Sequence, residues 1–113
     1  QNISAVMQDT NPKDVIIAIN DNAQDGIDIS WLWDVDFDRL GEESIRSITV
    51  SGIRCQDMRL RLKYVDIPSI LESDVEKAIR DRVADGTGNL YVLVNYTALF
   101  STRNILKKLE GEH

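Results

Sequence analysis

The residues best suited to chemistry lie in one polar stretch, residues 20–38, with the sequence NDNAQDGIDISWLWDVDFD. It combines carboxylates and amides, which can bind or orient polar groups, with two tryptophans of the kind enriched at protein interfaces. Loops of this length are uncommon in compact domains unless they have a function. The candidate site residues in this stretch are Asn22, Asp25, Asp28, Trp31, Trp33 and Asp34.

Several kinds of site are excluded by the residues that the chain lacks or misplaces. The single histidine, His113, is in the C-terminal tail, so neither a Ser-His or Cys-His pair nor a His/Cys metal site is expected. A calcium loop beginning at Asp34 would need glycine where Arg39 stands and glutamate where Ile45 stands. The Gly86-x-Gly88 turn precedes a predicted strand instead of following one, which is the wrong place for a phosphate loop. We therefore expect no metal and no cofactor in this chain.

Length and charge narrow the class of protein. The 113 residues are enough for one domain, residues 1–113. The net charge is −6, and residues 20–43 alone hold eight acidic side chains and one basic one. Such a segment repels phosphate backbones, which argues against nucleic acid and favours a basic or amide-rich partner. No apolar run is long enough for a transmembrane segment, no signal peptide is visible, and a single cysteine fits a reducing cytoplasm.

Strands and helices are expected to alternate along the chain. Apolar runs predict strands at 15–19, 45–51, 70–71 and 90–94. Apolar positions at helical spacing predict helices at 3–7, 54–65, 73–83 and 96–108, the third with a capping-box signature at Ser73 and Glu76. This alternation predicts an α/β fold, a three-layer, Rossmann-like, open and mainly parallel sheet with helices on both faces. Residues 109–113 are expected to form a flexible tail.

The fold class indicates where a site has to be. In open parallel sheets, ligands and partners dock at the carboxyl ends of the strands. The segments that leave those ends are 20–30, 51–54 and 95–97, and the first holds most of the functional groups. Arg54 could meet a substrate anion at this edge, although a surface position is the simpler interpretation. Cys55 falls on the apolar stripe of its helix, which predicts a small core residue.

Three motifs give the chain a resemblance to a known family: DNAQDGIDISWLWDVDFD, SGIRCQDMRLRLKY and LYVLVNYTAL. Together they resemble the MurT family, the Mur-ligase-like subunits of lipid II isoglutaminyl synthase, over nearly the whole chain. The first motif is highly specific and the other two support it. The resemblance implies the carboxyl-terminal Mur ligase domain, with a Rossmann-like fold, as a fragment of a larger ligase subunit.

The resemblance also implies a two-protein enzyme. MurT proteins use ATP to activate the α-carboxyl of D-glutamate in lipid II, which ammonia converts to D-isoglutamine for peptidoglycan synthesis. Their partner GatD is a glutaminase with a cysteine nucleophile and a histidine. In this family the aspartate two residues after the DG turn completes the GatD triad, and the matching residue is Asp28. An aspartate in this role fixes the tautomer of the histidine and stabilises the imidazolium.

Further expectations follow from the resemblance. Asn22, Asp25, Trp31, Trp33 and Asp34 would lie at or near the GatD interface, although Asn22 and Asp25 could instead shape the loop and one of the two tryptophans could be a core residue. ATP and Mg²⁺ would bind the central domain of the parent protein, which this chain lacks, so the isolated domain should be inactive. The complex would work in the bacterial cytoplasm at the inner membrane surface.

Two departures and three alternatives accompany this interpretation. The family usually has arginine where this chain has Ile27, which removes a charge beside Asp28, and Cys55 replaces what is commonly alanine. Asp28 could instead be a carboxylate that bonds nearby amides at a turn or helix start. The domain as a whole could be a non-catalytic docking module, or a regulatory α/β domain that binds a small molecule at the strand ends.

Overall fold

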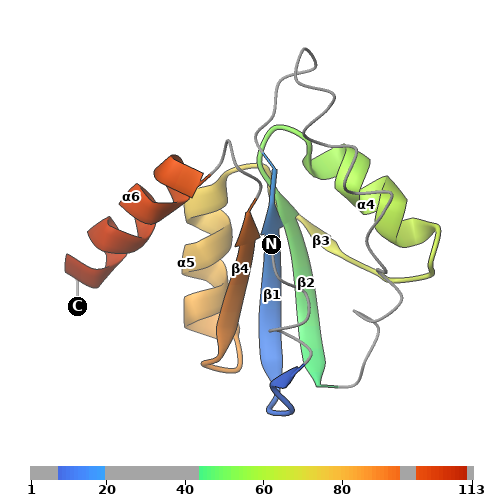
Figure 1. Cartoon of the computed structure of the whole chain (residues 1–113), viewed down its shortest axis with the longest axis horizontal. Helices are drawn as coiled ribbons and strands as arrows, with labels where there is room; N and C mark the ends of the chain where they lie inside the picture. The colour runs from blue at the N-terminus through green and yellow to red at the C-terminus, as the bar shows by residue number, and fades with distance from the viewer. Residues whose placement is uncertain (1–7, 20–43, 95–98, 112–113) are drawn as a thin grey trace.

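The structure, a computed structural model, describes residues 8–19, 44–94 and 99–111, with side chains from Arg103 onward in the last range (Figure 1). The strands are β1 (Lys13–Ala18), β2 (Ile45–Ser51), β3 (Ile70–Leu71) and β4 (Leu90–Val94). The helices are α4 (Cys55–Lys63), α5 (Val75–Asp85) and α6 (Leu99–Gly111). These elements occupy the ranges that apolar periodicity predicts, apart from differences at their ends.

All pairings between the described strands are parallel, in the order β3-β2-β1-β4. β1 is central, with Ile17 opposite Val50 of β2 and Leu93 of β4. Every residue of β1 is buried because its neighbours cover both its edges and helices cover both its faces. This explains the continuous apolar run that predicted the strand, and it confirms the expected α/β fold.

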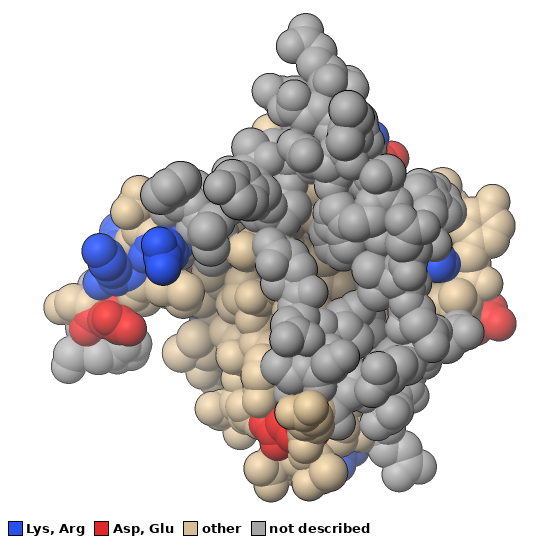
Figure 2. All heavy atoms as spheres, in the orientation of Figure 1, with Lys and Arg blue, Asp and Glu red and all other residues tan. Residues whose placement is uncertain are grey.

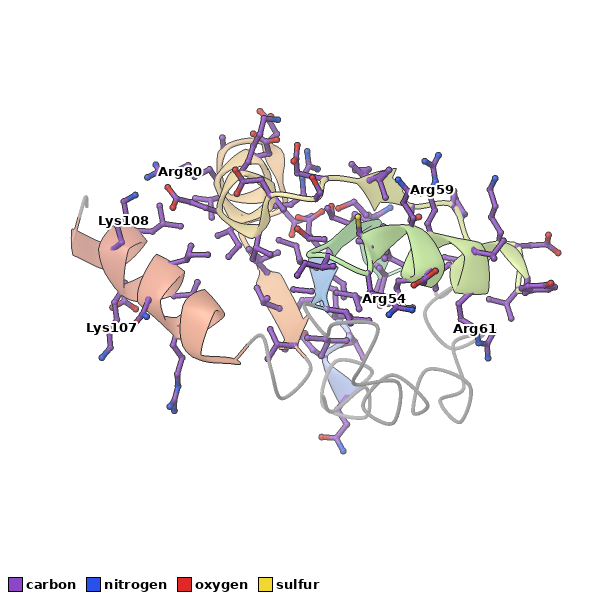
Figure 3. All side chains as sticks on the ribbon, turned by 90° about the horizontal axis from the view of Figure 1, so that it is seen from above. Arg54, Arg59, Arg61, Arg80, Lys107 and Lys108 are labelled. Atoms are coloured by element: carbon purple, nitrogen blue, oxygen red, sulfur yellow. The ribbon has the colours of Figure 1, made fainter. Side chains whose placement is uncertain are left out.

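Helices cover both faces of the sheet, which makes three layers. On one face, α4 packs through Met58 and Leu62 against Val15 and Ile17 of β1. On the other face, α5 packs through Ala78 and Ile79 against Ile16 and Ala18, with Ile105 and Leu109 of α6 at the margin of the same cluster. Seen along the strands, α4 and α5 lie on opposite sides of the sheet (Figure 3).

Several element ends differ from the predictions, among them those of α5, α6 and β1. The N-cap of α5 is Asp74, whose carboxylate accepts a hydrogen bond from the Lys77 N–H at 3.3 Å, so the predicted cap at Ser73 was wrong by one residue. α6 continues to Gly111, into the predicted tail, because Leu109 is an apolar contact of the core cluster under α5. β1 starts at Lys13, two residues earlier than predicted. The predicted helix at 3–7 lies outside the described residues.

Candidate functional site

The parallel strands place all their carboxyl ends at one edge of the sheet, at the top of Figure 1. The described residues at this edge, which we call the carboxyl rim, are Ile19, Ser51, Gly52, Arg54 and Ser73. The rim is held by backbone hydrogen bonds: Ile19 N–H donates to the Ser51 carbonyl at 3.0 Å, and Gly52 N–H donates to the Ser73 carbonyl at 3.0 Å. The point where the chain leaves β1 is thereby fixed.

Gly52 makes the sharp turn from β2 into α4 possible. Its φ of +88° lies in the left-handed region that side chains disfavour. The turn brings the Arg54 N–H back to the carbonyl of Ile19, at 3.0 Å. Ile19, the residue that directly follows β1, is therefore bonded to both ends of the β2–α4 turn.

The predicted site residues Asn22, Asp25, Asp28, Trp31, Trp33 and Asp34 lie outside the described residues. The structure does place the two ends of the segment to which they belong. The segment leaves the carboxyl rim after Ile19 and re-enters at Ser44, whose carbonyl accepts a hydrogen bond from Lys13 N–H at 2.8 Å at the opposite, amino edge. Asp28 is nine residues from the rim along the chain and sixteen from Ser44, so the rim is its nearer anchor.

A cavity of about 450 Å³ opens beside the rim at the start of α4, lined by Gly52, Ile53, Cys55, Gln56, Asp57 and Ser73. Arg54, for which an anion contact was the less favoured of two interpretations, donates from its guanidinium to the carboxylate of Asp57 at 2.5 Å. This ion pair neutralises the one cation at the rim. The cavity therefore offers an amide, a hydroxyl and a paired carboxylate, which can hold a polar group but supply no nucleophile.

Cys55 is part of the core, as predicted. It is 3% exposed and packs with the cluster that α4 forms on β1. Burial raises the pKa of the Cys55 thiol, and the negative charges of Glu72 and Asp57 act in the same direction, against the lowering effect of two backbone N–H groups. The thiol stays protonated at neutral pH and is not an activated nucleophile.

The amino edge holds a buried polar cluster that the sequence analysis missed. Asp14 is 3% exposed. It accepts hydrogen bonds from Ser47 Oγ at 2.6 Å and from the N–H and Oγ1 of Thr87 at 2.6 and 3.1 Å. Burial alone would raise the pKa of Asp14, but these hydrogen bonds outweigh it and lower the pKa below its ordinary value. Two charged residues directly ahead of an apolar run, Lys13 and Asp14, were the signal that could have revealed this cluster.

A second carboxylate, Asp9, joins the same edge. Its side chain accepts hydrogen bonds from Asn89 Nδ2 and from the hydroxyl of Tyr91, both at 2.8 Å, and from the backbone N–H of Asn11. The Asn89 bond contributes most to lowering the pKa of Asp9, and its carboxylate in turn raises the pKa of Tyr91. These groups bond one another, so the cluster stabilises the start of β1 and β4.

The described residues offer little to a metal or a phosphate. No group of three or more metal-binding side chains occurs among them. The Gly86–Gly88 turn lies at the amino edge against the Asp14 carboxylate, whose charge would repel a phosphate. None of the described helices is long and apolar enough to cross a membrane.

Comparison with known proteins identifies the family. A sequence profile described as MurT ligase C-terminal matches residues 1–99, most of the chain. The chain belongs to this family. MurT subunits of glutamine-hydrolyzing lipid II isoglutaminyl synthase from Staphylococcus aureus, strains COL and N315, are each 42% identical to it over 86 residues, which is 74% of this chain. The MurT subunit from Streptococcus pneumoniae strain ATCC BAA-255 / R6 is 32% identical over 98 residues, or 84% of this chain.

The match also shows how this chain relates to a complete MurT subunit. The matched region is only 20% of the Staphylococcus aureus proteins and 22% of the Streptococcus pneumoniae protein. The chain thus spans about a fifth of the length of these relatives. Membership of the MurT ligase C-terminal family agrees with the resemblance carried by the three motifs and with the parallel α/β sheet.

Proposed function

We propose that this chain is the carboxyl-terminal part of the ligase subunit of a glutamine-dependent amidotransferase, which amidates the D-glutamate of lipid II to D-isoglutamine. In this proposal Asp28 completes the catalytic triad of a GatD-type glutaminase subunit. The observation that carries the proposal is the match to MurT ligase C-terminal sequences over residues 1–99. The names of the relatives, which include a subunit and a glutamine-hydrolyzing activity, support a partner enzyme.

The fold supports a site contributed to a partner. β1 is the central strand, and its carboxyl end feeds directly into the segment that contains Asp28. Open parallel sheets bind ligands and partners at this edge. The hydrogen bonds from Ile19 to Ser51 and from Arg54 to Ile19 give that segment a fixed starting point. A carboxylate that reaches into another protein requires such an anchor.

The side chains of this chain are consistent with glutamine hydrolysis in which the partner supplies the nucleophile. Cys55 is buried with a raised pKa, and the only histidine is His113. In the proposed step the partner's cysteine attacks the glutamine side-chain carbonyl, and the partner's histidine transfers the thiol proton to the departing ammonia. Asp28 accepts a hydrogen bond from the other ring nitrogen of that histidine and remains ionised throughout.

ATP and Mg²⁺ belong, in this proposal, to the four-fifths of the parent subunit that lies outside this chain. The described residues contribute no phosphate cradle, since the Gly86–Gly88 turn faces the Asp14 carboxylate. The chain alone should therefore not ligate. Because the substrate is a lipid, the complete complex would work at the inner surface of the bacterial membrane.

Asp28→Asn in the full-length subunit tests the triad role. The amide cannot hold the partner's histidine in the required tautomer, so we expect kcat for glutamine hydrolysis to fall by roughly 10⁴-fold, as the same change does in serine proteases. Complex formation, measured by calorimetry, should persist. Asp36→Asn removes a charge from the same acidic run and should leave kcat within about twofold, as expected for a carboxylate with no triad role.

Unchanged hydrolysis by the Asp28→Asn complex would reject the triad role and leave the domain as a docking module. If the full-length subunit and the glutaminase do not associate at all, the alternative of a regulatory α/β domain would be favoured.

A further inference from the structure

The outer side of α4 and the turn before it expose three large apolar side chains, which we call the α4 stripe. Ile53, Leu60 and Tyr64 are 67%, 55% and 73% exposed. Leu60 and Tyr64 are four residues apart, on α4 and at its C-cap, on the side away from the buried Cys55, Met58 and Leu62, and Ile53 precedes the helix in the turn from β2. Single exposed apolar residues are ordinary, but three within twelve residues along one helix and the turn that leads into it indicate a contact surface.

A groove runs beside this α4 stripe, between α4 and the edge strand β3. It has a volume of about 400 Å³ and is lined by Gln56, Arg59, Leu60, Lys63 and Leu71. Ile70 and Leu71 of β3 are also exposed, and β3 is the last described strand on that side of the sheet. The groove is thus lined by two leucines together with two cations and an amide.

The charges around the stripe are basic. Arg59 and Arg61 leave α4 on opposite sides, and Arg54 lies at the rim end of the helix (Figure 3). Asp57 is neutralised by Arg54, whereas Arg59 and Lys63 form no ion pair with any residue that the structure describes. By contrast, the carboxylates of Glu72, just before α5, and of Glu76 and Asp81 on α5 pair with the cations Lys77, Arg80 and Lys108 of α5 and α6. Basic and acidic atoms lie next to each other over α6 in Figure 2.

The α4 stripe is continuous with the carboxyl rim. Ile53 and Gln56 line the cavity at the rim, and Gln56 also lines the groove. A stable protein interface buries about 800 Å² on each partner, which neither the rim cavity nor the groove could supply alone. A partner seated over the rim and extending along α4 would cover both.

From these observations we infer that the α4 stripe and its groove are the second half of the glutaminase docking surface. The inference rests on the proposed function. The matching surface on the glutaminase should present apolar side chains flanked by carboxylates. A concave groove fits side chains of a protein better than the flat surface of a bilayer, and the net charge of −6 opposes approach to anionic lipid.

The test introduces a glutamate into the full-length subunit, either on α4 or, as a control, on α5 or α6, which cover the other face of the sheet. Leu60→Glu and Lys63→Glu change the stripe and the groove. Val83→Glu and Lys107→Glu are matched controls on α5 and α6, and Val83 is 55% exposed, as is Leu60. We expect each stripe variant to raise the Kd for the glutaminase at least tenfold, or about 1.4 kcal/mol, and the controls to change it less than about twofold. Raising the glutaminase concentration should restore hydrolysis in the stripe variants.

Equal Kd values for stripe and control variants would overturn the inference. It would also fail if the stripe variants instead lost binding to phosphatidylglycerol vesicles with an unchanged Kd, which would indicate a membrane contact. A lower Tm of the free subunit in the stripe variants alone would place the stripe against the remainder of the same polypeptide. Asp28→Asn should lower kcat with an unchanged Kd, so failure of the docking surface and failure of the triad proposal give different results.

Discussion

Asp14 connects three segments at the amino edge of the sheet. One carboxylate oxygen accepts from Ser47 of β2, and the other accepts from Thr87 in the turn before β4. Because these hydrogen bonds favour the ionised form, the pKa of Asp14 lies below its ordinary value of 3.8. A carboxylate whose pKa is lower in the folded state stabilises the fold above its unfolded-state pKa, and this contribution is lost as the pH falls through the folded value.

Replacing Asp14 by Asn should destabilise the chain by about 2 kcal/mol at pH 7, because charged hydrogen bonds are lost and the new amide can place a donor opposite the Thr87 N–H. The difference from the unmodified chain should begin to shrink below about pH 4, where Asp14 becomes protonated in the unfolded chain, and should shrink further as the pH falls through the lower folded-state pKa. Urea unfolding at pH 7 and pH 3 measures both effects. Asp81→Asn, which breaks an exposed ion pair with Lys77, should cost less than about 0.5 kcal/mol. A loss from Asp14→Asn that is equal at both pH values would contradict the proposed role of its charge.

The burial of a single residue was predictable where the apolar pattern of its own helix or strand decided it. Cys55 lies on an apolar helical stripe, and the structure confirms it as a core residue. Lys13 and Asp14 were missed because their burial depends on partners far away in the chain: Ser44 and Ser47 follow them by more than thirty residues, and Thr87 by seventy-three. No local pattern in the sequence reports such pairings.

The turn between α5 and β4 is packed directly against Asp14. A Cβ added to Gly86 would lie 2.3 Å from the Arg82 carbonyl oxygen and 2.4 Å from Asp14 Oδ2. The end of α5 and the start of β4 can thus approach β1 only because residue 86 has no side chain. The sequence predicts a turn here, but the need for glycine at residue 86 arises from contacts that only the folded chain makes.

Gly86→Ala should therefore lower the stability of the chain by about 2 kcal/mol, since backbone and a buried carboxylate must move to admit the methyl group. Gly111→Ala, where no atom lies within 4 Å of the added Cβ, is the matched control and should be neutral or slightly stabilising. The double variant Gly86→Ala/Asp14→Asn should lose less free energy of unfolding than the two single variants together, because both changes disturb the same contact. Additive losses in chemical denaturation would show that Gly86 and Asp14 act independently.

Elements were predictable to within a few residues because apolar periodicity dictates which side of each segment is buried. The residues at which helices and strands begin and end were less predictable. The cap of α5 depends on whether Ser73 or Asp74 adopts the cap geometry, and Ser73 instead uses its carbonyl to bind Gly52 N–H. The length of α6 depends on a contact between Leu109 and the core cluster under α5.

At the scale of the whole molecule, the parallel sheet separates stability from the proposed function. The amino edge holds the polar cluster of Asp9 and Asp14, which satisfies its own hydrogen bonds. The carboxyl rim holds the exit of β1, a cavity and the end of the α4 stripe. Sequence reasoning could locate this edge from strand direction alone. It could identify Asp28 only through family resemblance, because isolated aspartates after a DG turn are common and the residue that they would orient belongs to another protein.

The most direct test of the central claim is an experimental structure of the full-length subunit bound to its glutaminase. We predict that a carboxylate oxygen of Asp28 lies within hydrogen-bond distance, about 2.6 to 3.2 Å, of a ring nitrogen of the glutaminase's catalytic histidine. A complex in which Asp28 faces its own backbone, or in which a carboxylate of the glutaminase itself binds that nitrogen, would contradict the account.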